Sequence, residues 1–227
     1  MFLPLHDDTP LKVIRFQFVT LAIIVLNVLI FLYIGPFGGD AIMARVEAWF
    51  GLVPVELLNV QIGHAAVPEP VTLITYLFLH ASWMHLIGNM LFMWVLADNI
   101  EDSFGNLGFL FFYLLCGVVG GLIHVFMMPG SPSPLIGASG SVSGIIAAYL
   151  VLYPRARIWV LAFLAIPIPL PAIVVLGGWF LLQIFSVFAA KEGQDIAWWA
   201  HIGGFLCGLI LTLGLRSWLL GQPNGRI

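Results

Sequence analysis

Six long apolar stretches, separated by polar segments, divide this chain of 227 residues. They lie near 14–34, 73–97, 107–128, 135–153, 158–190 and 196–220. A helix needs about 20 mostly apolar residues to cross the hydrocarbon core of a bilayer. The pattern therefore predicts an all-α polytopic membrane protein, with six transmembrane helices in one bundle.

The segments between these stretches predict the loops. Three are short polar hinges and one is a long connector, at 98–102, 154–157, 191–195 and 35–72. The first stretch is too long for the apolar part of a signal peptide, which favours a retained helix. We therefore expect a single membrane domain over 1–227, with a short N-terminal segment 1–13 and a helical core 14–220.

The fifth stretch is long for one crossing. It contains Pro167, Pro169 and Pro171, and proline interrupts helical hydrogen bonding. We expect the segment 158–171 to begin along the inner membrane interface before the crossing helix starts.

Composition gives the same answer. Of all residues, 61% are apolar and only 8% are charged, against about 25% charged in soluble domains. So few charges could not cover the surface of a water-soluble protein. The composition therefore indicates that the bilayer is the solvent of this chain.

Lysine and arginine set the expected orientation, because cytoplasmic loops carry an excess of both. With six crossings the two termini share one side, and that side holds Lys12, Arg15, Arg155, Arg157, Arg216 and Arg226. Only Arg45 and Lys191 lie on the other side. We expect both termini in the cytoplasm and the connector 35–72 outside.

Polar side chains inside apolar spans are costly and therefore mark candidate functional sites. They gather in three places, represented by His85 with Asn89, by Ser139 and by His201. Helical rise places Ser139 about 21 Å from the inner end of its stretch and His201 about 9 Å inside the outer charge Asp195. His85 and Asn89 lie about 24 and 18 Å above the inner side. All four are expected in one layer of the outer half of the membrane.

Helix periodicity also predicts that Ser139 and His201 lie close together. One face of the sixth stretch holds Ala197, His201, Gly204 and Gly208, and the fourth stretch has a comparable face with Gly140 and Gly144. Small residues let membrane helices approach closely. If these two faces meet, the Ser139 hydroxyl can reach the His201 ring.

The chemistry that these residues permit is acyl transfer. A serine hydroxyl becomes a nucleophile when a neighbouring base takes its proton, and His201 is the expected base. The oxyanion needs preplaced donors, which Asn89, His85 and the backbone N–H groups at the start of the fourth helix can supply. No carboxylate lies beside His201 in its own span, so we expect a Ser–His dyad.

At these residues the sequence resembles the rhomboid family of intramembrane serine proteases, over about 45–215. Gly137-Ala138-Ser139-Gly140 is similar to the family's nucleophile motif, and Ala200-His201-x-x-Gly204-x-x-x-Gly208 is similar to its sixth-helix motif. His80-x4-His85-x3-Asn89 resembles its second-helix motif, in which the residues matching His85 and Asn89 help bind the oxyanion. The resemblance implies catalysis by Ser139 and His201, with His80, Gly137, Gly140 and Gly204 in supporting positions.

The resemblance also implies partners and a location. Family substrates are transmembrane segments of other proteins, cut within the lipid bilayer. Tyr149-Leu-Val-Leu-Tyr153-Pro-Arg-Ala-Arg157 reads like prokaryotic members, which implies a prokaryotic inner membrane. No cofactor, metal or nucleic acid is expected.

The sequence departs from the family pattern in two places. Val71-Thr72-Leu73 stands where many members carry Trp-Arg, and Ser143 stands where some members have an aromatic ring on the catalytic histidine. The remaining polar or reactive residues receive structural interpretations. Ser141 and Ser143 are expected in helix contacts, His124 at the interface, Trp179 and Gln183 as packing or gate residues, and Cys116 and Cys207 as small core residues.

Other functions fit less well. A zinc protease would show His-Glu-x-x-His, but His80 and His85 are five apart with no glutamate between them. An aspartyl protease needs two acids inside spans, and a transporter would show acids or broken helices in paired halves. The alternative left open is a catalytically inactive relative that binds membrane clients.

Overall fold

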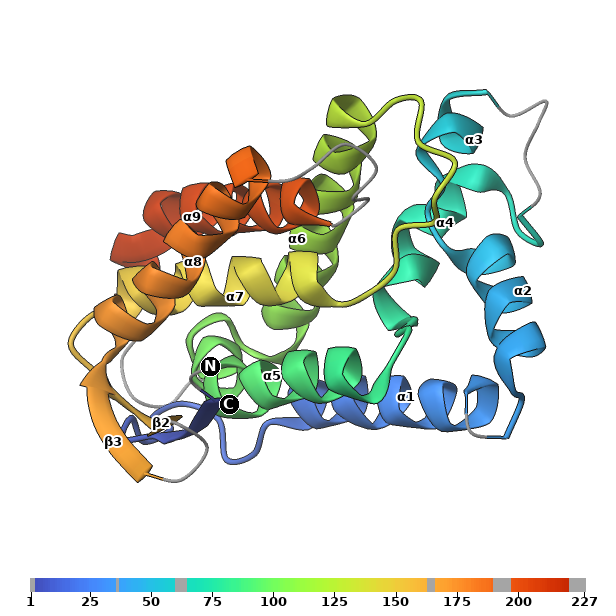
Figure 1. The fold of residues 1–227 in the computed structure, drawn as a ribbon. Coiled ribbons are helices and arrows are strands. Elements are labelled where there is room, and N and C mark those ends of the chain that lie inside the picture. Colours follow the sequence, from blue (N-terminus) through green and yellow to red (C-terminus); the bar gives the residue numbers. More distant parts are fainter. Residues whose placement is uncertain (1–2, 36, 60–64, 163–165, 190–196, 221–227) are drawn as a thin grey trace.

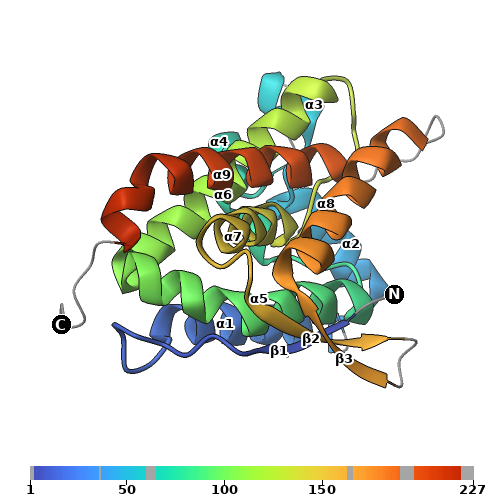
Figure 2. The ribbon, with the colours of Figure 1, turned by 90° about the vertical axis from the view of Figure 1, so that its left-hand side faces the viewer.

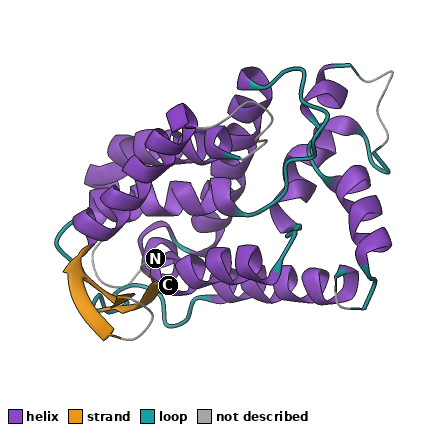
Figure 3. Cartoon of the chain, in the orientation of Figure 1, coloured by secondary structure: helices purple, strands orange, loops and turns teal. Residues whose placement is uncertain are grey.

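The computed structural model describes residues 3–35, 37–59, 65–162, 166–189 and 197–220. Helices dominate these residues, and a small sheet lies at one end (Figure 3). The elements are, in order, β1 (Leu3–Asp7), α1 (Phe18–Ile34), α2 (Asp40–Phe50), α3 (Pro54–Leu58), α4 (Glu69–Thr75), the 3-10 helix η2 (Tyr76–Phe78), α5 (Trp83–Phe104), α6 (Asn106–Met127), α7 (Ser139–Leu152), β2 (Arg157–Ala162), β3 (Ile166–Pro171), α8 (Ala172–Ala189) and α9 (Trp198–Leu220).

The centre of the molecule is α7. Figure 2 shows it end-on, with α5, α6, α8 and α9 around it, and all four helices contact it. Every residue from Gly140 to Tyr149 is buried. A helix with small or apolar residues on all sides has no face suited to water and is expected in the interior. On the far side of α5, α1 forms an outer layer (Figure 1).

Several helices are long and apolar enough to cross a membrane. Among the described residues these are α6, α8 and α9, and a fourth span results if α5 is joined to the bent segment before it. The helices α1 and α7 are apolar but shorter, with 17 and 14 residues. The chain is thus a membrane protein of several apolar helices, while the count of six spans stays a prediction.

Both limits predicted for the second span, 73–97, are wrong. The chain bends by 82° between Glu69–Phe78 and α5, so α5 starts only at Trp83. The expected polar hinge 98–102 is the last part of α5 and is largely buried, with Glu101 and Asp102 at 0% and 3% exposure. The carboxylates of Glu101 and Asp102 can be buried in this helix because the N-terminal segment supplies hydrogen-bond donors for both of them.

These donors are backbone N–H groups. The Asp102 carboxylate accepts hydrogen bonds from the N–H groups of Lys12, Val13 and Ile14, at 2.9, 2.7 and 2.7 Å. Glu101 accepts from Val19 and Thr20 in the first turn of α1, where helix N–H groups lack partners of their own. The negative charge also lies at the positive end of the α1 dipole. The end of α5 therefore caps α1.

The all-α expectation needs a correction, because the chain also forms a three-stranded antiparallel sheet in the order β1-β2-β3. The segment 158–171, expected along the membrane interface, forms most of β2 and all of β3. Pro167, Pro169 and Pro171 alternate along β3, an edge strand, where the missing N–H groups break no ladder. Sequence periodicity could not indicate that the N-terminal residues supply the third strand.

The sheet lies near the C-terminal end of α7, and its strand β1 contacts α5 (Figure 1). Asp7 of β1 accepts hydrogen bonds from the Tyr149 hydroxyl of α7 and, at 2.9 Å, from the Asn99 amide of α5. Burial raises the pKa of the Asp7 carboxyl above its ordinary value of 3.8, and the hydrogen bond from Tyr149 acts against that shift. This contact ties the N-terminal strand to the two central helices.

The small faces of α7 and α9 meet, as the sequence predicts. A β-carbon on Gly204 would collide with the backbone carbonyl of Gly140, and one on Gly208 would collide with that of Gly144. Neither backbone atom can move away without displacing a whole helix. The two glycines of α9 therefore set its distance from α7.

We expect Asp102→Ala to lower the free energy of unfolding by about 2–4 kcal/mol, because three backbone N–H groups lose their acceptor. Thermal unfolding in detergent micelles measures this change. The matched control is Asp40→Ala, which alters an exposed acid at the start of α2 and should change stability by at most about 1 kcal/mol, the usual size of a surface helix-dipole interaction. Equal stabilities of the two variants would contradict this account of the α1 cap.

We expect Gly208→Ala to lower the free energy of unfolding by about 1–3 kcal/mol through overpacking against α7. Gly214 lies on the same helix with open space around it. Gly214→Ala should therefore leave stability unchanged or raise it by up to about 1 kcal/mol, as alanine favours helices. The same unfolding assay tests both, and a Gly208→Ala protein as stable as the Gly214→Ala protein would refute the contact.

Candidate functional site

Ser139 is the first residue of α7, and backbone hydrogen bonds hold the loop that precedes it in place. The Gly137 N–H donates to the Tyr76 carbonyl at 2.9 Å, and Leu52 and Leu135 pair in an isolated bridge. The connector 35–72 thus braces the loop that leads into the site. Gly137 has φ of +120°, a conformation that other residues rarely adopt, and a β-carbon there would lie 2.6 Å from His85 Nε2.

The Ser139 hydroxyl and the His201 ring are in contact. Ser139 Oγ lies 2.7 Å from His201 Nε2, a hydrogen-bond distance between residues 62 positions apart. His201 lies in the first turn of α9, where Gly204 brings the helix against α7. Serine and imidazole at this distance form the pair in which a base can take the hydroxyl proton.

The second nitrogen of His201 has a partner that the sequence did not indicate. His201 Nδ1 lies 2.8 Å from Gln183 Oε1 on α8, and the ring of Trp179 lies 6.0 Å from the histidine ring, centre to centre. Position 143 is a serine and offers no aromatic ring to the histidine, so the aromatic neighbour of His201 is Trp179 of α8. The only signal in the sequence is that Trp179 and Gln183 lie four apart and share a helix face.

His80, His85 and Asn89, which lie in the turn before α5 and at its start, are also close together. Asn89 Nδ2 lies 3.0 Å from His80 Nε2, and the rings of His80 and His85 are 4.9 Å apart in an edge-to-face arrangement. Since Nδ2 can only donate, His80 accepts through Nε2, and this bond fixes the orientation of the Asn89 amide. Asn89 Nδ2 would also lie 3.7 Å from a β-carbon on Gly137. His80 therefore supports Asn89 beside the loop that precedes Ser139.

A cavity of about 380 Å³ opens beside the Ser139–His201 pair. Its lining residues are Ala81, His85, His124, Ser133, Pro134, Leu135, Ile136, Ser139, Ala197 and His201. His124, expected at the membrane interface, is buried and faces this cavity. The lining of this cavity is partly polar, since it includes three histidines and two serines.

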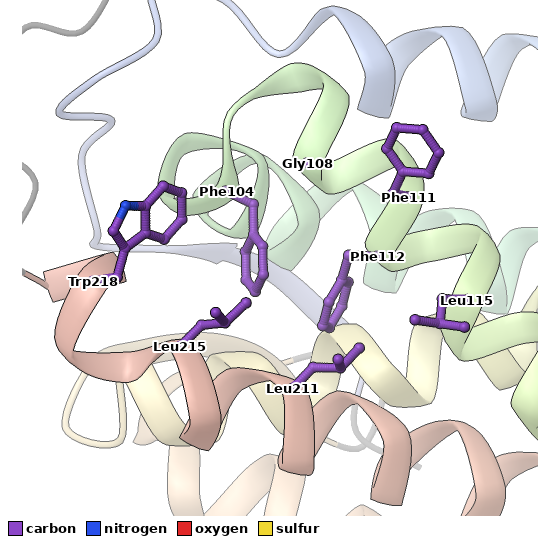
Figure 4. Close-up of a pocket in the computed structure, with 8 residues that line it drawn as sticks. All are labelled: Phe104, Gly108, Phe111, Phe112, Leu115, Leu211, Leu215 and Trp218. Carbon is purple, nitrogen blue, oxygen red and sulfur yellow. The ribbon is translucent and has the colours of Figure 1, made fainter.

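A larger groove of about 450 Å³ lies between α6 and α9 and is apolar. Figure 4 shows the rings and aliphatic side chains that line it, among them Phe112, Leu211 and Trp218. None of its lining residues is a nucleophile or a titratable group. Size alone therefore does not identify the site.

The structure offers no alternative centre for metal chemistry in the part of the chain that it describes. No three His, Cys, Asp or Glu side chains gather there in a way that could hold a metal ion. Cys116 and Cys207 are free thiols on α6 and α9. The hinge 191–195, the outer charge Asp195 and Arg226 lie outside the described residues, so the depth of His201 relative to Asp195 stays a prediction.

Comparison with known proteins gives a consistent result. The model of the Rhomboid domain family matches residues 68–218, which contain all of the candidate site residues. Rhomboid-like protein 11, chloroplastic, of Arabidopsis thaliana is 27% identical over 160 residues, covering 66% of this chain and 52% of that protein. RHOMBOID-like protein 12, mitochondrial, of the same organism is 30% identical, covering 64% of this chain and 46% of that protein.

A further relative is Rhomboid-like protease 3 of Toxoplasma gondii, which is 29% identical over 143 residues, covering 61% of this chain and 49% of that protein. The chain spans about half the length of these relatives. All three come from eukaryotes, and two are named as organellar, so they give no support to the expected prokaryotic inner membrane.

Proposed function

Because this chain belongs to the rhomboid family, we propose that it is an intramembrane serine endopeptidase that cleaves transmembrane segments of other membrane proteins. One observation carries the proposal. Ser139 Oγ lies 2.7 Å from His201 Nε2, at the edge of a partly polar cavity inside a bundle of apolar helices. Serine and histidine in hydrogen-bond contact at such a place are the minimum for acyl transfer.

The first half of the reaction forms an acyl-enzyme. His201 Nε2 accepts the Ser139 hydroxyl proton while Oγ bonds to the substrate carbonyl carbon, and the carbonyl oxygen becomes an oxyanion. The imidazolium then gives the proton to the amide nitrogen as the C–N bond breaks, and the amine leaves. In the second half, water gives its proton to Nε2 and attacks the acyl carbon, after which Ser139 recovers its proton and the acid is released.

The oxyanion needs donors already in place, because their electrostatic stabilisation acts where charge develops. We assign this role to the Ser139 backbone N–H, the His85 ring and the Asn89 amide. His85 lines the cavity, and the hydrogen bond to His80 uses one of the two N–H bonds of Asn89 Nδ2. The N-terminus of α7 adds the positive end of its dipole.

We further propose that α1, α5, α6, α7, α8 and α9 are six membrane-crossing helices of one domain over 1–227, with both termini in the cytoplasm. The apolar character of α1 and α7 supports this count although they are short. A short α7 suits a nucleophile at its start, since Ser139 then lies within the membrane rather than at its surface. The lysine and arginine distribution supports the orientation.

We expect a fluorophosphonate probe to label the purified, detergent-solubilised protein at Ser139. Ser139→Ala and His201→Ala should each lower the labelling rate by at least about 10³-fold, because the two residues act as one unit. The matched control is Ser186→Ala, which removes a half-buried serine of α8 whose hydroxyl donates to the Leu182 carbonyl, and this variant should label at the wild-type rate.

The competing function is a catalytically inactive protein that binds membrane clients. Absence of labelling in folded wild-type protein, judged by its thermal unfolding, would favour that function. Labelling that persists in Ser139→Ala would show that another serine reacts and would reject the assigned nucleophile.

We expect Asn89→Ala to lower kcat by about 10²-fold with little change in KM, as loss of one oxyanion donor acts mainly on the transition state. Cleavage of a single-span model substrate in proteoliposomes measures both constants. The control is Asn99→Ala, which removes an asparagine amide on the same helix near the sheet. This variant shows how far kcat falls when only stability is reduced. An Asn89→Ala enzyme with wild-type kcat would remove Asn89 from the oxyanion site.

A further inference from the structure

The two nitrogens of the His201 ring face partners of different kinds. Nε2 faces the Ser139 hydroxyl, while Nδ1 lies 2.8 Å from the side-chain oxygen of Gln183. An amide oxygen can only accept a hydrogen bond, so Nδ1 must carry the proton. In the neutral ring this leaves the lone pair on Nε2, which is the nitrogen that must take the serine proton.

We propose that Gln183 is a positioning residue for His201, which fixes the ring tautomer and orientation that the base requires. The assignment rests on the function proposed above. In Ser–His–Asp enzymes a carboxylate holds the histidine from its other nitrogen. Here a neutral amide occupies the corresponding place. An amide avoids the desolvation that a carboxylate would suffer within the membrane.

The surroundings of Gln183 agree with a specific role. Its neighbours Leu181, Leu182 and Phe185 expose 66%, 62% and 68% of their surfaces, as expected for a helix that faces lipid. A polar side chain on such a helix is costly unless it has a partner. The partner here is His201, whose other ring nitrogen contacts Ser139.

The contact between α8 and α9 is formed by a short set of residues. Phe180 stacks on Phe205 of α9 with ring centres 3.6 Å apart, and Trp179 lies beside His201. Gln183 continues this face by one helical turn. The proposal therefore makes α8 part of the site, because His201 receives its tautomer from α8 and meets its serine on α7.

The decisive variant is Gln183→Met, which keeps the length and flexibility of the side chain and removes the acceptor. Leu182→Met is the matched control, since it introduces the same residue at the adjacent, exposed position. Gln183→Glu restores an acceptor for Nδ1. Fluorophosphonate labelling over a range of probe concentrations gives the maximal labelling rate and the apparent probe affinity for each protein.

We expect Gln183→Met to lower the maximal labelling rate by about 10–100-fold with unchanged probe affinity. Gln183→Glu should keep the rate within about threefold of wild type, and Leu182→Met should match wild type. A slow Gln183→Met protein whose rate the Glu variant does not recover would indicate a packing effect and overturn the proposal.

The tautomer of His201 can be measured without any chemical reaction. Nitrogen-15 NMR of histidine-labelled protein in liposomes distinguishes a protonated Nδ1 from a protonated Nε2, and the His201→Ala spectrum assigns the signal. We expect a single Nδ1–H form in wild type and a mixture in Gln183→Met. An unchanged Nδ1–H signal in that variant would overturn the proposal even if wild type labels well, and a mixture would support it even if wild type does not label.

Discussion

The structure depends on one close contact, the approach of α9 to α7 through glycine. At Gly204 and Gly208 the backbone of α9 lies against the carbonyls of Gly140 and Gly144, where no β-carbon would fit. Membrane helices cannot rely on the hydrophobic effect to associate in lipid, so close van der Waals packing takes its place. The distance between Ser139 and His201 is a consequence of this contact, because each lies within one turn of it.

The rest of the molecule holds α7 in place. The connector pairs with the loop before Ser139 through Leu52 and Leu135, and Tyr76 accepts the Gly137 N–H with its carbonyl oxygen. At the opposite end Asp7 binds the Tyr149 hydroxyl, and the acids of α5 hold the segment that leads into α1. Both ends of the central helix are therefore fixed by polar contacts, while its sides are packed with small and apolar residues. Ser139, at the start of such a helix, therefore has little freedom to move.

The site itself is built in two layers. Ser139 and His201 are in direct contact. Around them, Gln183 of α8 forms a hydrogen bond with His201, and His80, in the turn before α5, forms one with Asn89. The candidate site as a whole thus receives its geometry from α5, α7, α8 and α9 together. This arrangement explains why short sequence motifs, which each cover one helix, describe the site only in part.

The sequence by itself determined the membrane class, the mainly helical fold and the glycine faces, and it singled out Ser139, His201, His85 and Asn89 as candidate site residues. These follow from local patterns, because hydrophobicity and the helical repeat decide which side of its own helix a residue takes. Only the tertiary structure decided that Gln183 faces His201, that the N-terminal strand completes the sheet, and that Glu101 and Asp102 cap α1 rather than form a hinge. Each of these joins residues far apart in the chain, and a local pattern contains no information about which distant backbone N–H or side chain will satisfy a buried polar group.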